Sequence, residues 1–315
     1  MIVKDEERIA KNPLVTVQVF AYNKEAYIRQ CLDSIVNQKV NFEFEVLVSE
    51  NPGTDNTRSI CLEFQKNHPD IVILILREKN MGLFYNYFEA ERMSRGKYIA
   101  RCDGDDYWCD DNKLQKQVDF LESHNDYGLC YTPTIILNDE THQFINQVYK
   151  NAKDDFKSLL IAETVQQSTA MYRKDLVQKY FEEIKPEEKD WAMEDTPRTL
   201  WFAFNSKIAR IDEITGVYRV INNSWSHQTD YYKQERYHKS ILDIRLFFYN
   251  KYCPGESDLL IPLYNDYYSR NIKSAYELKN FKALWNNIIK YKYTSITILI
   301  RHALKLLLFP FRYYF

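Results

Sequence analysis

Glycine is scarce in this chain, with 7 among 315 residues, whereas tyrosine (25) and phenylalanine (18) are abundant. The 6 cysteines form no Cys-x-x-Cys pair, which argues against a disulfide framework and favours a reducing compartment. No run of about 18 uncharged apolar residues occurs, so we expect no membrane-spanning helix. The first residues, 1–13, contain no apolar stretch and predict no secretory signal. A net charge of −2 gives no general attraction to nucleic acid.

Strand-like and helix-like segments alternate along the first hundred residues. Four short apolar runs each end in polar residues, as buried strands followed by loops do. Between these runs, apolar side chains recur at helical spacing. The alternation predicts an α/β fold with a mostly parallel sheet flanked by helices. The expected strands are 14–23, 42–51, 70–78 and 97–103, and the expected helices are 24–38, 57–68 and 86–95.

The pattern is looser after residue 130. A helix is expected from Asp195, with Pro197 in its first turn, because both residue types favour a helix start. The chain is expected to be helical from about residue 231, and we therefore predict two domains, 1–230 and 231–315. The remaining expected strands lie in 128–137, 166–174 and 206–220.

Three carboxylates, Asp103, Asp105 and Asp106, fall within four residues directly after the strand expected at 97–103. Like charges at this density repel, so either water screens them in an exposed loop or a cation lies among them. Parallel sheets bind ligands at the carboxyl ends of their strands. Mg²⁺ or Mn²⁺ takes carboxylate oxygens and fills its other positions with water and phosphate oxygens. The offsets do not fit an EF-hand, and a cation beside a nucleotide diphosphate remains the chemical alternative to a solvated loop.

A second acidic pair, Glu194 and Asp195, lies at the start of the helix expected near residue 195. A carboxylate there can serve as a general base that takes a proton from an acceptor hydroxyl. It can equally cap the helix, which contributes about 1 kcal/mol with no chemistry. The residues alone leave both interpretations open.

Five stretches in order resemble the family 2 glycosyltransferases, which are inverting enzymes with the GT-A fold, a Rossmann-like, mostly parallel sheet flanked by helices. The likeness covers about residues 14–230. Its stretches read VTVQVFAYNKEAYIRQCLDSIVNQ, EVLVSENPGTDNT, NMGLFYNYFEAERMSRGKYIARCDGDDYW, MEDTPRTLWFA and GVYRVINNSWSH. In the same order, they are similar to the family's nucleotide loop, its second strand and turn, its Asp-x-Asp strand, its catalytic-base segment, and the closing stretch of a bacterial subgroup.

The resemblance implies a metal-dependent, hexosyltransferase-type reaction at a nucleotide-sugar site. Asp105 would bind Mn²⁺ or Mg²⁺ directly, and Asp103 would lie towards the ribose, the donor sugar and the metal. His227 would contact the metal or the diphosphate, with a plain surface histidine as the alternative. The remaining donor contacts would be Ala21, Tyr22, Asn23, Glu50, Asn80 and Gly82.

The same resemblance implies that Asp195 is the catalytic base and that Glu194 supports it. One in-line displacement by the acceptor oxygen would then invert the anomeric carbon. Trp108 and Trp191 lie next to the two acidic sites in sequence, where each could stack on an acceptor sugar or belong to the core. No basic residue follows Gly82 at the place where many relatives carry one, so Arg101 and Arg219 are the candidates for diphosphate contacts.

The last 46 residues, 270–315, carry nine Lys and Arg against one acid, Glu277, a local charge of about +8. Their apolar end fits a basic amphipathic tail that lies on an anionic membrane, with packing on the catalytic domain as the alternative. We therefore expect a cytoplasmic protein, peripheral on the inner face of the plasma membrane. It would transfer a sugar, as a UDP-sugar, to a glycan or lipid-linked acceptor of a bacterial surface polysaccharide.

Two other functions remain as alternatives. A sugar nucleotidyltransferase also uses metal, nucleotide and carboxylates, but it needs a glycine-rich basic loop after the first strand, where this chain reads AYNKEAY. A non-catalytic glycan- or nucleotide-binding module needs neither Asp105 nor Asp195, and both are present.

Overall fold

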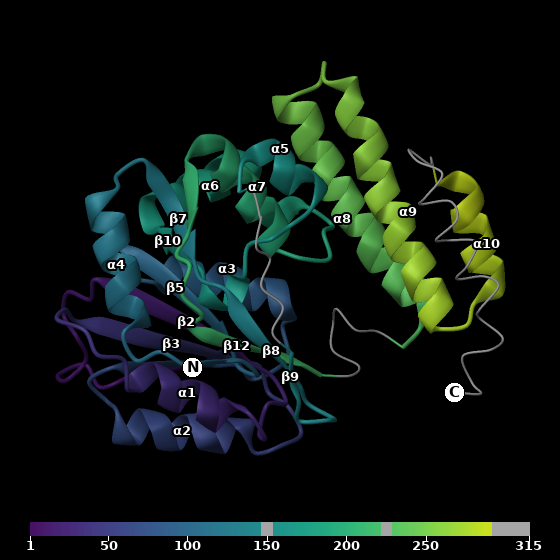
Figure 1. Ribbon diagram of the computed structural model, residues 1–315. Helices are drawn as coiled ribbons and strands as arrows, with labels where there is room; N and C mark the ends of the chain where they lie inside the picture. The colour runs from purple at the N-terminus through teal and green to yellow at the C-terminus, as the bar shows by residue number, and fades with distance from the viewer. Residues whose placement is uncertain (146–153, 222–228, 292–315) are drawn as a thin grey trace. The chain divides into compact units, whose positions relative to one another are not determined.

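The computed structural model describes residues 1–145, 154–221 and 229–291 (Figure 1). Internal packing divides the chain into two compact units, and each is described by itself. Unit 1 comprises Met1–Phe156, Thr164–Lys189 and Arg198–Val220, and unit 2 comprises Lys157–Glu163, Asp190–Pro197 and the chain from Ile221 onward. The boundary at residue 230 stays a prediction.

Unit 1 is built around an eight-stranded sheet in the order β1-β4-β3-β2-β5-β10-β7-β11. Its centre, β4-β3-β2-β5, is parallel throughout, as the sequence predicts, because helices connect these strands. Both β1 and β10 run antiparallel to their neighbours, which makes the sheet mixed. The strands are β1 (Ile2–Val3), β2 (Val15–Ala21), β3 (Phe44–Glu50), β4 (Val72–Leu76), β5 (Tyr98–Asp103), β7 (Tyr127–Tyr131), β10 (Met171–Arg173) and β11 (Lys207–Arg210).

Alternate side chains of the central strands enter two separate hydrophobic clusters, as the two-residue period of a strand requires. On one face, Val17 and Val46 pack with α1 (Ile28–Val36), α2 (Thr57–Asn67) and α4 (Lys113–Ser123). On the other face, Phe20 and Leu47 pack with α3 (Leu83–Met93). The central strands are thus covered on both faces, and α1 and α2 run side by side along the first (Figure 1).

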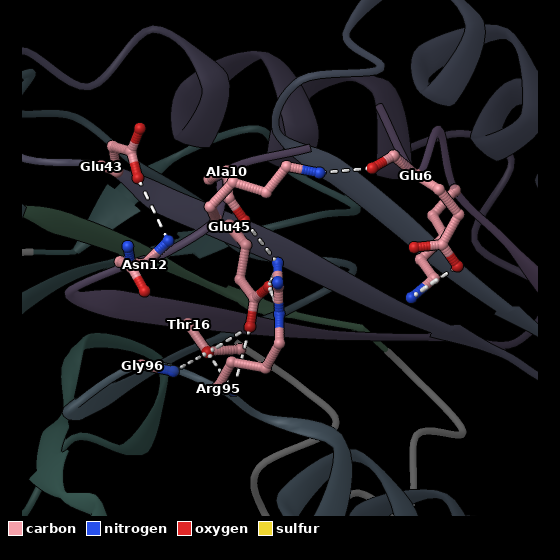
Figure 2. A network of polar contacts seen from close by, with 10 residues as sticks. Glu6, Ala10, Asn12, Thr16, Glu43, Glu45, Arg95 and Gly96 are labelled. Atoms are coloured by element: carbon pink, nitrogen blue, oxygen red, sulfur yellow. Dashed lines mark hydrogen bonds and ion pairs between the residues drawn. The ribbon is translucent and has the colours of Figure 1, made fainter. Parts of the chain in front are cut away.

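A buried ion pair fixes the edge of the sheet where the parallel strands begin (Figure 2). Glu45 of β3 is completely buried, and its carboxylate accepts hydrogen bonds from Arg95 Nε at 2.8 Å and from Thr16 Oγ1 at 2.7 Å. The guanidinium also donates to the carbonyl of Ala10, and the Thr16 hydroxyl accepts from the Gly96 amide. This network holds the turn before β5 against the first residues of β2 and β3. It thereby fixes the direction of β5, whose carboxyl end lies at the opposite edge of the sheet.

The segment 128–137, expected as one strand, forms two, because Pro133 interrupts it. Its second half belongs to a smaller sheet in the order β6-β12-β8-β9. Its strands are β6 (Tyr107–Trp108), β12 (Gly216–Val220), β8 (Thr134–Asn138) and β9 (Phe144–Ile145). Between residues 154 and 206 the chain also forms the helices α5 (Phe156–Ile161), α6 (Lys174–Ile184) and α7 (Asp195–Asn205).

Three helices account for most of the described residues of unit 2: α8 (Tyr231–Tyr252), α9 (Leu260–Glu277) and α10 (Phe281–Lys290). Two of them begin at side-chain caps, where Asp230 accepts from the Lys233 amide at 2.9 Å and Asn280 accepts from the Ala283 amide at 3.0 Å. The helical character expected from residue 231 is therefore confirmed for the described residues up to 290. Residues 292–315, which hold the predicted membrane tail, lie outside the described part of the chain.

Candidate functional site

The four parallel strands end at one edge of the sheet. The register pairs Ala21 with Glu50, Glu50 with Leu76, and Phe20 with Asp103. The polar residues that follow these strands therefore gather on a single rim of unit 1, which is where α/β sheets bind their ligands.

The backbone of the acidic motif folds back on the end of β2. The Gly104 amide donates to the carbonyl of Phe20 at 3.2 Å, and the Asp106 amide donates to the carbonyl of Asp103 at 2.9 Å. A Cβ atom on Gly104 would lie 2.7 Å from the Phe20 carbonyl oxygen, so the close approach requires glycine. This tight turn presents Asp103 and Asp105, both partly exposed, at the rim.

The third carboxylate of the motif has a different environment. Asp106 is 2% exposed and accepts a hydrogen bond from the Arg219 amide at 2.8 Å. Burial, and then the neighbouring charges of Asp105 and Asp103, raise the pKa of Asp106 well above its usual range. Three adjacent carboxylates are tolerated because one of them is buried and favours its neutral form. Asp106 thus joins the motif to β12.

Asp105 is paired with a cation of the chain itself. Lys24 Nζ forms an ion pair with Asp105 Oδ2, and both side chains are partly buried. The Lys24 amide in turn donates to Thr57 Oγ1 at 2.7 Å, which fixes the start of the side chain. Apart from its place next to Asn23, nothing in the sequence marks this lysine as a site residue.

Both arginines suggested for the diphosphate are engaged elsewhere. Arg219 Nε donates to the Asp105 carbonyl at 2.9 Å, and its guanidinium lies 4.7 Å from the ring centroid of Tyr27. Arg101 is 2% exposed, and its guanidinium lies over the rings of Tyr87 and Phe20 on the α3 face of the sheet. Arg219 therefore holds the backbone of the acidic motif, and both guanidinium groups already have partners within the chain.

The loop after β2 is tied to the loop after β3 by the side chain of Asn23. Asn23 has a left-handed backbone (φ 52°), and its side-chain oxygen accepts from the Thr54 amide at 2.9 Å. A Cβ atom on Gly53 would lie 1.9 Å from that oxygen, so glycine is required there. In front of Asn23, Ala21 is buried and Tyr22 is 46% exposed, which leaves the tyrosine ring available at the rim.

Glu50 is less available than the resemblance implies. It is 1% exposed, and its carboxylate accepts from Arg58 Nε at 2.8 Å. Burial raises the pKa of Glu50, while the hydrogen bond and charge of Arg58 act in the opposite direction. Its carboxylate is thus committed to joining β3 to α2, and its implied role as a donor contact stays a prediction.

The loop after β4 is shaped by two asparagines. Asn80 Oδ1 accepts from the Gly82 amide at 2.9 Å, and Asn51 Oδ1 accepts from the Met81 amide at 3.3 Å. Gly82 has a positive φ of 84°, from which α3 begins. Asn51 is therefore a positioning residue that connects the ends of β3 and β4, a role that the sequence did not identify.

The second acidic pair belongs to unit 2. Asp195 is the first residue of α7, and its Oδ1 accepts from the Thr196 amide at 2.7 Å. Glu194 is 9% exposed. The local geometry is that of a helix start, and it also fixes the orientation of the Asp195 carboxylate.

A third carboxylate, beside Glu194 and Asp195, was not identified from the sequence. Thr196 Oγ1 donates to Glu163 Oε2 at 2.5 Å, so Thr196 bridges Glu163 and Asp195. Burial, and then the charge of Asp195, raise the pKa of Glu163 to about 7, against the opposing effects of Thr196, Arg245 and Arg270. The available signal was that Glu163 is the only charged residue between Lys157 and Arg173.

The two tryptophans proposed for acceptor stacking occupy packed positions. Trp108 is 4% exposed, its Nε1 donates to the Ser168 carbonyl, and Lys113 Nζ lies 3.9 Å from its ring centroid. Trp191 packs on Phe247 of α8 in unit 2, with ring centroids 5.4 Å apart. Trp108 is therefore part of the core of unit 1, which is the alternative that the sequence left open.

Within residues 1–145, 154–221 and 229–291, no group of three or more His, Cys, Asp and Glu is arranged to hold a metal ion. The donor set at Asp103 and Asp105 instead fits a cation that takes one or two carboxylates from the protein and its other oxygens from phosphate and water. The ammonium of Lys24 on Asp105 shows that a positive charge is accommodated there.

His227 lies outside the described residues. Among the helices that are described, none has the length and apolar character needed to cross a bilayer.

The fold is similar to that of solved glycosyltransferases of the GT-A type. Residues 1–349 of TarS of S. aureus, in complex with UDP-GlcNAc, superpose with a TM-score of 0.64 at 18% identity, covering 88% of this chain and 80% of that TarS fragment. The mannosyltransferase PcManGT of Pyrobaculum calidifontis, in complex with GDP-Man and Mn²⁺, gives 0.58 at 17% identity, covering 95% and 83%. At these identities the likeness shows the GT-A fold that the sequence predicts.

Curated relatives are more similar in sequence but differ in length. The uncharacterized protein Rv1520 of Mycobacterium tuberculosis is 29% identical over 209 residues, which is 65% of this chain and 58% of that protein. The dTDP-rhamnosyl transferase RfbG of Shigella flexneri is 32% identical over 119 residues, 36% of this chain and 40% of RfbG. The chain thus spans under two thirds of the length of these relatives.

The family model described as "Glycosyl transferase family 2" matches residues 16–181. The matched range is more than half of the chain and runs from β2 through the acidic motif to α6. The chain belongs to glycosyl transferase family 2.

Proposed function

We propose that this protein is a glycosyltransferase that moves a sugar from a nucleotide diphosphate sugar to a hydroxyl of a glycan acceptor. The observation that carries the proposal is the gathering of Asp103 and Asp105 with the ends of β2, β3 and β4 on one rim of unit 1. Family membership and the nucleotide sugars bound by TarS and PcManGT support it. A UDP-sugar is the proposed donor.

The donor would lie along the rim, with Tyr22 and Asn23 beside the base and ribose and with the loop of Asn80 and Gly82 along the nucleotide. Asp105 and Asp103 would hold Mn²⁺ or Mg²⁺. The chemistry that such a cation supplies when bound is neutralisation of the charge on the departing diphosphate. Lys24 would leave Asp105 and offer its ammonium to the same negative charge.

Asp195 is the proposed base. Its carboxylate takes the proton of the acceptor hydroxyl as that oxygen attacks the anomeric carbon from the side opposite the diphosphate. The bond between the anomeric carbon and the diphosphate oxygen breaks in the same step, which inverts the configuration. Glu194 is proposed to support Asp195. Glu163, whose carboxylate accepts a hydrogen bond from the Thr196 hydroxyl, is a third acidic group beside Asp195.

The acceptor is proposed to be a lipid-linked sugar in the synthesis of a bacterial surface polysaccharide. The support is the basic, apolar sequence of residues 292–315, which fits a protein bound peripherally to the inner face of the plasma membrane.

Asp195→Asn tests the proposal directly. The variant should bind donor as the wild type does, yet its turnover should fall by about 10² or more, the low end of what loss of a general base costs. Nucleotide sugars are first screened for thermal stabilisation with Mn²⁺, and turnover is then measured by release of nucleoside diphosphate. The matched control is Asp190→Asn, an exposed acid five residues earlier. Near-normal turnover in Asp195→Asn would leave Asp195 as a helix cap only.

A further inference from the structure

Helix α10 of unit 2 has one buried and one exposed face. Ala283, Leu284 and Asn287 are buried, and Asn287 Nδ2 donates to the Tyr231 hydroxyl at 2.9 Å. On the other face, Trp285 is 56% exposed and Ile289 is 66% exposed. Because these two residues are four apart, they lie one above the other on the helix surface. The helix is thus fixed to the unit by one side and presents large apolar side chains on the other.

The same apolar stripe extends by one turn to Phe281, which is 58% exposed. Large apolar side chains grouped on one exposed helix face mark a binding surface more often than isolated ones do. We call the face of Trp285 and Ile289 the α10 stripe.

The charged residues of α10 and of its two flanking turns are all basic. Residues 278–291 contain three lysines, Lys279, Lys282 and Lys290, and no Asp or Glu, whereas the whole chain carries a net charge of −2. Lys282 and Lys290 are exposed on the helix itself. The sequence that continues from residue 292 adds Lys292, Arg301, Lys305 and Arg312, again with no acid. An apolar stripe within a wholly cationic stretch is complementary to a surface that is apolar inside and negative outside.

We propose that the α10 stripe binds an anionic lipid membrane, with Trp285 and Ile289 entering the interface and Lys282 and Lys290 meeting the phosphates of the headgroups. Tryptophan favours this depth because its ring is apolar and its N–H remains hydrated. A helix with a basic polar side and bulky apolar residues on the other lies in the plane of the interface. The proposal names a structured surface for the membrane binding suggested under the proposed function, and it does not depend on the transfer chemistry.

The occupant is a membrane and not a protein, because the three lysines without any acid suit a surface of uniform negative charge. A second copy of the chain would place these lysines against each other at a symmetric contact, where like charges repel. Lipid binding also predicts a dependence on salt, since the attraction of exposed charges is screened beyond about 8 Å at physiological ionic strength.

The test uses the full-length chain and vesicles of phosphatidylcholine with or without phosphatidylglycerol. The double variant W285S/I289S should bind the anionic vesicles at least tenfold more weakly than the wild type in co-sedimentation. The matched control is F144S/I145S, which removes two apolar side chains of similar exposure (60% and 50%) from β9 in unit 1. The control should bind as the wild type does.

A second measurement reports on Trp285 alone. Brominated lipid should quench the fluorescence of the wild type more than that of W285F, and the difference is the signal of Trp285 in the interface. Equal vesicle binding by W285S/I289S together with equal quenching of W285F overturns the proposal, as does a wild type that does not bind. A change from dimer to monomer in W285S/I289S, with vesicle binding unchanged, would assign the stripe to a second copy and also overturn it.

The two proposals fail in different ways. Turnover with a soluble acceptor analogue should be the same for the wild type and W285S/I289S, because the stripe takes no part in the chemistry. A wild type that binds vesicles but transfers no sugar would refute the proposed function and leave the lipid surface standing. A wild type that transfers sugar but does not bind vesicles would refute the lipid surface and leave the proposed function standing.

Discussion

Replacing Glu163 by glutamine should make unfolding of unit 2 harder at about pH 8 and leave it nearly unchanged at about pH 5. In the folded protein, burial and the charge of Asp195 raise the pKa of Glu163 from its ordinary 4.5 to about 7. The folded state therefore holds the proton more tightly than the unfolded chain does. The stabilisation from this group is fully present below about pH 4.5 and is lost as the pH rises through about 7.

The size of the effect follows from the same pKa values. A difference of about 2.5 in pKa, at about 1.36 kcal/mol for each unit, gives an upper limit of about 3 kcal/mol that the ionised carboxylate costs above pH 7. Glutamine has nearly the same shape, and its side-chain oxygen can still accept the hydrogen bond of the Thr196 hydroxyl. The variant should therefore recover most of this free energy at pH 8.

Urea denaturation followed by tryptophan fluorescence measures this, because Trp191 and Trp285 both report on unit 2. The control is Glu277→Gln, the same chemical change at an exposed side chain of α9, which should alter the free energy of unfolding by no more than about 0.5 kcal/mol at either pH. The reasoning is refuted if Glu163→Gln differs from the wild type by the same amount at both pH values, or if it is less stable at pH 8.

Three further predictions concern unit 1. Asp105→Ala should abolish Mn²⁺-dependent binding of a nucleoside diphosphate while the fold survives, and unchanged affinity in calorimetry would remove Asp105 as the metal ligand. Lys24→Met should raise the affinity for Mn²⁺ alone, because the ammonium that now occupies Asp105 Oδ2 is removed, and an equal or lower affinity would contradict this competition. Arg95→Ala should lower the free energy of unfolding, measured by chemical denaturation, by about 3–5 kcal/mol, because it leaves the fully buried Glu45 without its counter-charge. The control Arg29→Ala breaks an exposed pair and should cost about 1 kcal/mol or less, so equal losses would show that burial does not set the difference.

The sequence predicted the elements that depend on short-range patterns. The strands β2 to β5 and the helices α1 to α3 lie close to the expected ranges, because a two-residue or 3.6-residue apolar period is a local property. The helix start at Asp195 was also predicted, since a cap depends on one side chain and the next turn. The gathering of strand ends on one rim followed from these elements, because parallel strands joined by helices must end on the same side.

Pairing between distant segments could not be read in the same way. The antiparallel direction of β10 and the break of 128–137 into two sheets depend on which strands become neighbours. Glu163 lies 32 residues before Asp195, and their link through Thr196 arises only in the folded unit. Trp108 lies next to the acidic motif in sequence, yet its ring turns into the core.

The sequence by itself determined the α/β alternation, the family and the position of Asp103 and Asp105 at the end of β5. The tertiary structure alone decided the environment of each charged group, and with it the role each can have. Glu50 is bound by Arg58, Asp106 is buried, and Asp105 is met by Lys24 from 81 residues away. The physical reason is that periodicity and capping act between residues a few positions apart, whereas burial and charge pairing are set by whichever side chains the fold brings within a few ångströms.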